Sequence, residues 1–203
     1  MLSGYSQEGR TYGPRIGIDL ARIPPYFMNP EKQGFELSFD AELLTNFYPV
    51  IEIGKSKLTF ESEHYDHYCN GAYFRIGFDY NILAYYSEIP YDMGFIGLRY
   101  GYSGLTYHTD NITIQDKYWG NFTGSIPGAE MDAHWLEITG GLRTEIFSNF
   151  FMGWTVRAKF MLNKTEPALL YPHEIAGFGK GNKKSLLGVS FSVYYKIPVY
   201  RSK

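Results

Sequence analysis

The chain has 203 residues, a length that suits a single all-β domain. Nineteen basic and 21 acidic residues give a net charge of −2, and no basic stretch alternates with aromatics, which argues against a nucleic-acid partner. No run of 18 apolar residues occurs, which argues against a transmembrane helix, so this chain could cross a membrane only as a closed barrel.

The start of the chain does not have the pattern of a secretion signal. Residues 1–8 contain no basic start, apolar core or small-residue cleavage site. An outer-membrane protein needs an export signal, so we expect this sequence to be a mature or engineered form. We expect residues 1–13 to be an N-terminal extension, 14–200 to be one domain and 201–203 to be a short tail.

Eight segments show the alternation of apolar and polar residues that predicts a β-strand with one wet and one apolar face. The last segment is the clearest, because every odd position from Leu187 to Val199 is apolar. Its length exceeds the roughly 9–11 residues that a tilted strand needs to cross a bilayer. In chain order the predicted strands are 14–22, 35–43, 47–59, 74–82, 93–107, 133–147, 150–162 and 187–199.

The connections between these strands alternate in length. Leu44–Phe47 and Phe147–Phe150 are near-duplicate tight turns, and 84–92 is a modest link. The longer connections are 22–32, 60–71, 108–132 and 163–184. Outer-membrane barrels combine short periplasmic turns with longer extracellular loops. The sequence therefore predicts an all-β, eight-stranded, antiparallel up-and-down transmembrane β-barrel.

In this register the charged side chains of the strands fall on one face. They are eight acids and seven bases: Arg15, Asp19, Glu36, Asp40, Glu42, Glu52, Arg75, Asp79, Arg99, Glu137, Arg143, Glu145, Arg157, Lys159 and Lys196. A barrel of eight strands is only wide enough to be filled by side chains. We therefore expect a polar interior packed with an ion-pair network and no open pore. The alternative is a soluble lipocalin-like barrel, in which the apolar face surrounds a ligand.

Four short motifs carry a resemblance that spans about residues 14–199. They are Gly17-Ile18-Asp19-Leu20, Gly34-Phe35-Glu36-Leu37, Gly77-Phe78-Asp79-Tyr80-Asn81 and Gly97-Leu98-Arg99-Tyr100-Gly101-Tyr102. With them the chain resembles the small eight-stranded outer-membrane proteins, and most of all an uncharacterised outer-membrane family of Bacteroidota. The resemblance implies an integral protein of the bacterial outer membrane. It also implies a structural or accessory role in a larger envelope complex, such as the β-barrel assembly machinery.

Two clusters of reactive side chains suggest other functions. His64, Asp66 and His67 could hold a divalent metal, although such a cluster in a surface loop is more often solvated. A rim set of Ser62, Ser185, His64, His108, His173 and Glu174 would suit a lipid-modifying enzyme, but no nucleophile-elbow pattern marks either serine. We expect no metal, no cofactor and no catalysis, and keep the lipid-modifying enzyme as the alternative.

The long loops carry apolar side chains that would be unfavourable in water unless a partner covered them. These side chains are Trp119, Phe122, Leu169, Leu170, Tyr171 and Phe178. We therefore expect the protein to contact outer-membrane lipid through its wall, and other outer-membrane proteins or surface lipoproteins through these loops.

Overall fold

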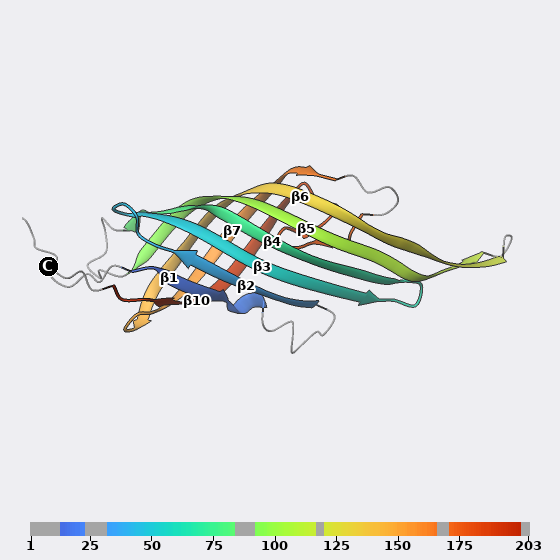
Figure 1. Ribbon diagram of the computed structural model, residues 1–203, viewed down its shortest axis with the longest axis horizontal. Coiled ribbons are helices and arrows are strands. Elements are labelled where there is room, and N and C mark those ends of the chain that lie inside the picture. Colours follow the sequence, from blue (N-terminus) through green and yellow to red (C-terminus); the bar gives the residue numbers. More distant parts are fainter. Residues whose placement is uncertain (1–12, 23–31, 84–91, 117–119, 166–170, 200–203) are drawn as a thin grey trace, which may run out of the picture.

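The computed structural model describes residues 13–22, 32–83, 92–116, 120–165 and 171–199, and within them the chain forms a closed eight-stranded barrel. Figure 1 shows an elongated barrel in which the first strand, β1, lies beside the last strand, β10. All strand pairings are antiparallel, and neighbours in sequence are neighbours in space. The predicted eight-stranded, up-and-down architecture is confirmed.

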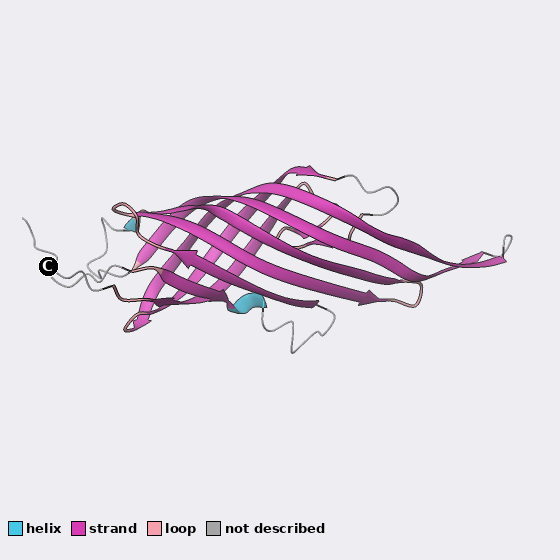
Figure 2. Ribbon diagram, in the orientation of Figure 1, coloured by secondary structure: helices cyan, strands magenta, loops and turns pink. Residues whose placement is uncertain are grey.

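The barrel strands follow the predicted order, with a small hairpin inserted before the last one. β1 pairs with both β2 and β10 and so closes the barrel. Strands make up most of the coloured ribbon in Figure 2. The elements are β1 (Arg15–Asp19), η1 (Leu20–Arg22), β2 (Lys32–Asp40), β3 (Phe47–Glu61), β4 (Asp66–Asn81), β5 (Met93–Asp116), β6 (Gly120–Phe147), β7 (Phe150–Lys164), β8 (Glu174–Ile175), β9 (Gly179–Lys180) and β10 (Ser185–Lys196).

Several strand boundaries differ from the prediction. The expected loop 60–71 is mostly strand, because β3 and β4 continue to a tight connection around residues 62–65. The expected loop 108–132 is also mostly strand, because β5 and β6 continue as a long hairpin. In both places the outward face becomes polar, for example at Glu61, Asn70, His108 and Glu130, so the apolar-outward alternation stops before the strand does. β1 is shorter than expected, because the chain turns into η1 after Asp19.

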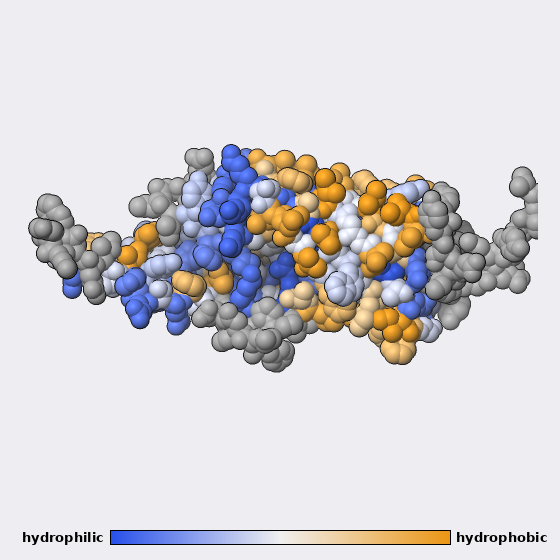
Figure 3. All heavy atoms as spheres, turned by 180° about the vertical axis from the view of Figure 1, so that it is seen from behind, coloured by the Kyte–Doolittle hydropathy of each residue, from blue (hydrophilic) through white to orange (hydrophobic). Residues whose placement is uncertain are grey.

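The outer wall carries an apolar belt. Outward-facing side chains such as Ile51, Ile76 and Trp154 are exposed, the last of them by 63%. Figure 3 shows this belt in orange, beside a hydrophilic zone nearer the long hairpin. An outward apolar band around a polar interior is the arrangement of a transmembrane barrel. The lipocalin-like alternative is wrong, because it would require these apolar side chains inside.

An aromatic and histidine zone lies on β5 and β6 where the belt gives way to polar residues. The Tyr100 hydroxyl lies 2.6 Å from His134 Nδ1, and the Tyr102 hydroxyl donates to Asp132 at 2.8 Å. Rings with a polar tip suit the boundary between lipid and water, because one end is apolar and the other is hydrated. We infer that the membrane surface on the long-hairpin side lies near this zone. None of the described helices is long and apolar enough to span a membrane.

Candidate functional site

The middle of the lumen holds a buried ion-pair cluster centred on two arginines. Arg75 contacts Glu52 at 2.6 Å, Glu36 at 2.9 Å and Glu137 at 3.0 Å. Arg157 reaches the same three carboxylates at 2.8, 3.5 and 3.2 Å respectively. Each glutamate projects inward from a different strand, so the cluster links β2, β3, β4, β6 and β7 across the lumen. Pairing of this kind offsets the cost of removing charges from water.

A second cluster continues the charged layer toward the short turns. Arg143 donates to Asp40 at 3.0 Å and to Asp79 at 3.2 Å. Arg15 pairs with Asp40 at 2.6 Å, and Arg99 pairs with Asp79 at 2.7 Å. At the end of the lumen, a small buried apolar cluster of Tyr48, Met93 and Phe95 closes the space. The lumen is therefore filled on this side.

The remaining charged residues of the predicted network have different surroundings. Asp19 accepts a hydrogen bond from the backbone of Ala21 and lies 3.6 Å from Arg22. Lys159 donates to backbone carbonyls.

Glu42 and Glu145 were expected beside the network, but they accept hydrogen bonds from the backbone N–H groups of Asn46 and Asn149 at the two twin turns. Glu145 therefore supports a turn because it is too close to the barrel end to reach the cluster.

The other half of the lumen is apolar, and a folded segment fills it. The segment 171–183, which we term the plug, contains the β8–β9 hairpin. Its Ile175, Ala176 and Phe178 are buried together with Cys69, Leu105, Tyr107, Met131, Ala133 and Trp135 of the barrel wall. The Phe178 ring meets the Trp135 ring edge-on at 5.8 Å between centroids. The plug therefore adds an apolar core above the charged clusters.

Polar contacts fix the plug to the barrel. Arg75 and Lys159 both donate to the carbonyl of Gly177, at 3.2 and 2.6 Å. The Cys69 thiol donates to the carbonyl of Glu174 at 3.0 Å. Gly177 has a φ of +76°, and a Cβ there would lie 2.5 Å from the ring of Tyr73, so this tight turn requires glycine.

The plug changes the interpretation of the predicted partner loop. Phe178 was expected on an exposed loop, but it is buried in the lumen, where the apolar lining gives it a place to pack. Phe122 and Tyr171 are exposed, by 60% and 47%. Trp119, Leu169 and Leu170 lie outside the described residues.

The residues considered for metal binding do not converge. His67 points into the barrel, where its Nδ1 lies 2.9 Å from the hydroxyl of Thr109 and its Nε2 accepts from the backbone of His173. His64 is exposed, and Asp66 accepts from Asn111. Among the residues that the structure describes, no three potential ligands group together.

The residues considered for catalysis are dispersed over the rim. Glu174 pairs with Lys32 at 2.6 Å, and the ring of His173 stacks on Phe60. His108 lies 3.7 Å from Asp110, and both side chains are about half exposed. No serine–histidine hydrogen bond occurs within the described ranges. The described residues therefore do not assemble the serine, histidine and acid set that the alternative of a lipid-modifying enzyme would need.

The plug was missed from the sequence although a signal for it exists. Inward positions on β4 and β6 change from charged to apolar or small beyond Arg75 and Glu137, at Gly71, Cys69, Ala133 and Met131. Where the lumen is lined by apolar side chains it cannot hold an ion-pair network, so apolar groups must fill the space to keep it packed. The run Ile175-Ala176-Gly177-Phe178 is a segment that could fill it.

Comparison with known proteins supports the fold. The chain is similar to a major outer membrane protein from Thermus thermophilus, with a TM-score of 0.52 and 9% identity over 92% of this chain and 98% of that chain. Ail, the attachment invasion locus protein of Yersinia pestis, gives a TM-score of 0.48 and 12% identity over 92% of this chain and 99% of its own. CarO2 of Acinetobacter baumannii gives a TM-score of 0.45 and 12% identity over 92% of this chain and 98% of its own.

No curated protein matches this chain. The likeness to the Thermus thermophilus protein shows the fold alone, and the expected origin in Bacteroidota stays a prediction. A family model does match, over residues 5–202. The chain therefore belongs to the DUF6048 family, which is described as a domain of unknown function.

Proposed function

We propose that this protein is a non-enzymatic, integral barrel of the bacterial outer membrane that acts as an accessory subunit by contacting other envelope proteins. The observation that carries the proposal is the long β5–β6 hairpin, which extends well beyond the other strands (Figure 1). Location in the outer membrane is supported by the apolar belt and by the fold shared with outer-membrane barrels.

The filled lumen favours a role at the surface. Charged clusters fill its middle, and the plug fills its other half. Transport of a solute would require both layers to separate, which would leave buried charges unpaired. The outer surfaces and loops are therefore the parts available for function.

The hairpin offers unpaired strand edges. β4 stops pairing with β5 at Asp110, and β7 stops pairing with β6 at Ala133. Beyond these points the two strands pair with each other from Ile112 opposite Gly124 to Asp116 opposite Gly120, and the Thr113 N–H still donates to the His64 carbonyl at 2.8 Å. Exposed edges can add a strand from a partner, and the exposed Phe122 ring supplies apolar contact area. A larger barrel or a surface lipoprotein would suit this surface, and the β-barrel assembly machinery is the first complex to test.

Site-specific photocrosslinking tests the proposal in intact cells. A photoreactive amino acid replaces Phe122 in the full chain, and the matched control replaces Leu44, an exposed apolar residue at the opposite end of the barrel. We expect Phe122, and not Leu44, to yield a crosslinked envelope protein of defined mass. Mass spectrometry of that species then identifies the complex.

Deletion of the hairpin tip provides the second measurement. Replacing residues 112–125 by a two-residue turn removes the tip of the hairpin with Phe122 and leaves the barrel pairings in place. The shortened protein should still insert in the membrane but should no longer co-purify with the crosslinked partner. Equal crosslinking at both positions, or recovery of the partner by the shortened protein, would refute the role of the hairpin.

A further inference from the structure

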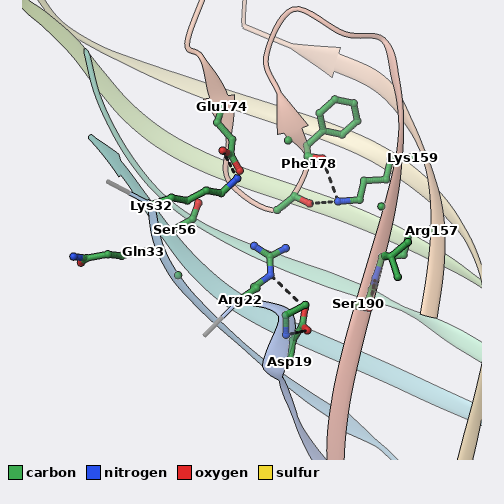
Figure 4. Close-up of a pocket in the computed structure, with 16 residues that line it drawn as sticks. Asp19, Arg22, Lys32, Gln33, Ser56, Arg157, Lys159, Glu174, Phe178 and Ser190 are labelled. Atoms are coloured by element: carbon green, nitrogen blue, oxygen red, sulfur yellow. Dashed lines mark hydrogen bonds and ion pairs between the residues drawn. The ribbon is translucent and has the colours of Figure 1, made fainter. Parts of the chain in front are cut away.

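The barrel wall has a seam beside β1. The β1–β2 pairing ends at Ile18 opposite Leu37, and the β1–β10 pairing ends at Asp19 opposite Ser192. β2 continues to Lys32 and β10 to Ser185, and none of the strands that the structure describes lies between these outer parts of β2 and β10. A cavity of about 280 Å³ lies there between η1, β2, β10 and the plug (Figure 4).

Cations predominate in the lining of this cavity. Arg22, Lys32, Arg157 and Lys159 line it, against two acids, Asp19 and Glu174. Lys32 is paired with Glu174, and Arg157 is paired with the glutamates of the lumen cluster. Lys159 has no carboxylate partner among the described residues, and Arg22 contacts Glu36 and Asp19 through its Nε, so these are the two cations to consider for a ligand.

Lys159 is a buried cation held by backbone alone. Its side-chain nitrogen donates to the carbonyls of Gly177 and Phe178 at 2.6 and 3.1 Å, and none of the described carboxylates lies within 4 Å of it. Lys159 is only 7% exposed. An ammonium group has three donors, so these two carbonyls leave one for an anion.

Arg22 faces the same space from η1. Its Nε lies 3.0 Å from Glu36 and 3.6 Å from Asp19, while Figure 4 shows the rest of the guanidinium directed into the cavity toward the plug. A planar guanidinium and an ammonium that converge from two sides form a good receptor for phosphate oxygens.

The wall around the seam is apolar. Ile18, Phe35, Leu187 and Val189 all face outward and are exposed. A free inorganic anion would gain nothing from these residues, whereas acyl chains would cover them. The combination of a cationic cavity with an apolar wall therefore fits an amphiphile with an anionic head.

We propose that the seam binds a phosphate-bearing membrane lipid, with the phosphate between Lys159 and Arg22 and the acyl chains along the wall formed by β1, β2 and β10. The lipid would supply the counter-charge that Lys159 lacks and would cover the gap left by the short β1. This site is separate from the β5–β6 hairpin and does not depend on the proposed accessory role.

Native mass spectrometry of the full chain in an uncharged detergent tests the proposal. The probes are dioleoyl phosphatidic acid, dioleoylglycerol, which lacks the phosphate, and inorganic phosphate. We expect a saturable one-to-one complex with phosphatidic acid that is about tenfold tighter than that with dioleoylglycerol, since charge-assisted hydrogen bonds to a desolvated phosphate are strong. Inorganic phosphate alone should not form a stable complex.

Two variants localise the binding. Arg22→Gln should weaken phosphatidic acid binding about tenfold, by the loss of one guanidinium contact. Lys57→Gln, which removes an exposed cation from β3 outside the cavity, should leave binding unchanged. Arg22 makes no hydrogen bond to the described part of the plug, and unchanged heat-modifiable migration in gels would verify folding of both variants.

Three results would overturn the proposal. Equal phosphatidic acid binding by Arg22→Gln and Lys57→Gln would show that the lipid is not held at the seam. Equal binding of dioleoylglycerol would remove the role of the phosphate. Tight binding of inorganic phosphate would show that the cavity takes a free anion and not a lipid.

Discussion

The central arginine of the lumen offers a quantitative test of the charge-filled interior. Arg75 is fully buried and lies within 3.0 Å of three carboxylates on three other strands. Replacing it by Met retains most of the volume but leaves Arg157 as the one cation in contact with all three glutamates, beside the single contacts of Arg22 with Glu36 and of Arg99 with Glu52. Removing one partner of a buried ion pair costs about 3–5 kcal/mol, and we expect Arg75→Met to lie in this range.

The free energy of unfolding can be measured by urea titration of the protein in lipid vesicles, with tryptophan fluorescence as the readout. A second variant combines Arg75→Met with Glu137→Gln, which removes one of the excess negative charges. In the native protein the Trp135 indole N–H donates to Glu137 Oε1 at 2.7 Å, and the glutamine keeps an oxygen that can accept this hydrogen bond. The double variant should be at least about 1 kcal/mol more stable than Arg75→Met alone, because contacting residues couple by about 0.5–3 kcal/mol. A loss below about 0.5 kcal/mol for Arg75→Met, typical of a surface substitution, would refute the packed ion-pair cluster.

Three other predictions concern the belt, a turn and the plug. Trp154→Arg should lower the free energy of unfolding by about 2–4 kcal/mol, because it places a charge against hydrocarbon. Thr106→Arg, nearer the tip of the hairpin, should lower it by less than about 1 kcal/mol. Equal losses for the two variants would contradict the assigned belt. Asn149→Ala should lower the free energy of unfolding by about 1–2 kcal/mol because Asn149 has a φ of +67°, whereas Asn149→Gly should leave it nearly unchanged. Urea titration measures both variants, and an unchanged stability of Asn149→Ala would refute the turn geometry. Phe178→Ala should loosen the plug and speed maleimide labelling of the buried Cys69, while an unchanged labelling rate would show that the plug does not shield this thiol.

Much of the barrel could be predicted from the sequence because each strand has one lipid-facing and one lumen-facing side. Alternation from Leu187 to Val199 indicates both the strand and its orientation, since a shift by one residue would expose every apolar side chain to the wrong face. The same logic placed Arg75 and Glu137 on the inner face. Their individual pairings depend on which strands lie across the lumen, and this follows from closure of the barrel.

The plug and the long hairpin could not be predicted in the same way. Beyond the membrane the outward face of a strand can be polar, so the apolar-outward signal that marks the strand ends near Thr106 and His108 although pairing continues. Phe178 was expected to be exposed because a lone aromatic in a long connection has no periodicity to orient it. Its burial is determined by the apolar lumen of strands distant in sequence, especially Trp135.

Planar-bilayer recording of the purified full-length protein tests most directly whether the lumen is closed. The ion-pair clusters around Arg75 and Arg143 and the plug around Phe178 fill the described lumen with buried side chains. We expect insertion without a steady conductance at either polarity. A steady ohmic current that scales with salt concentration would contradict the filled lumen.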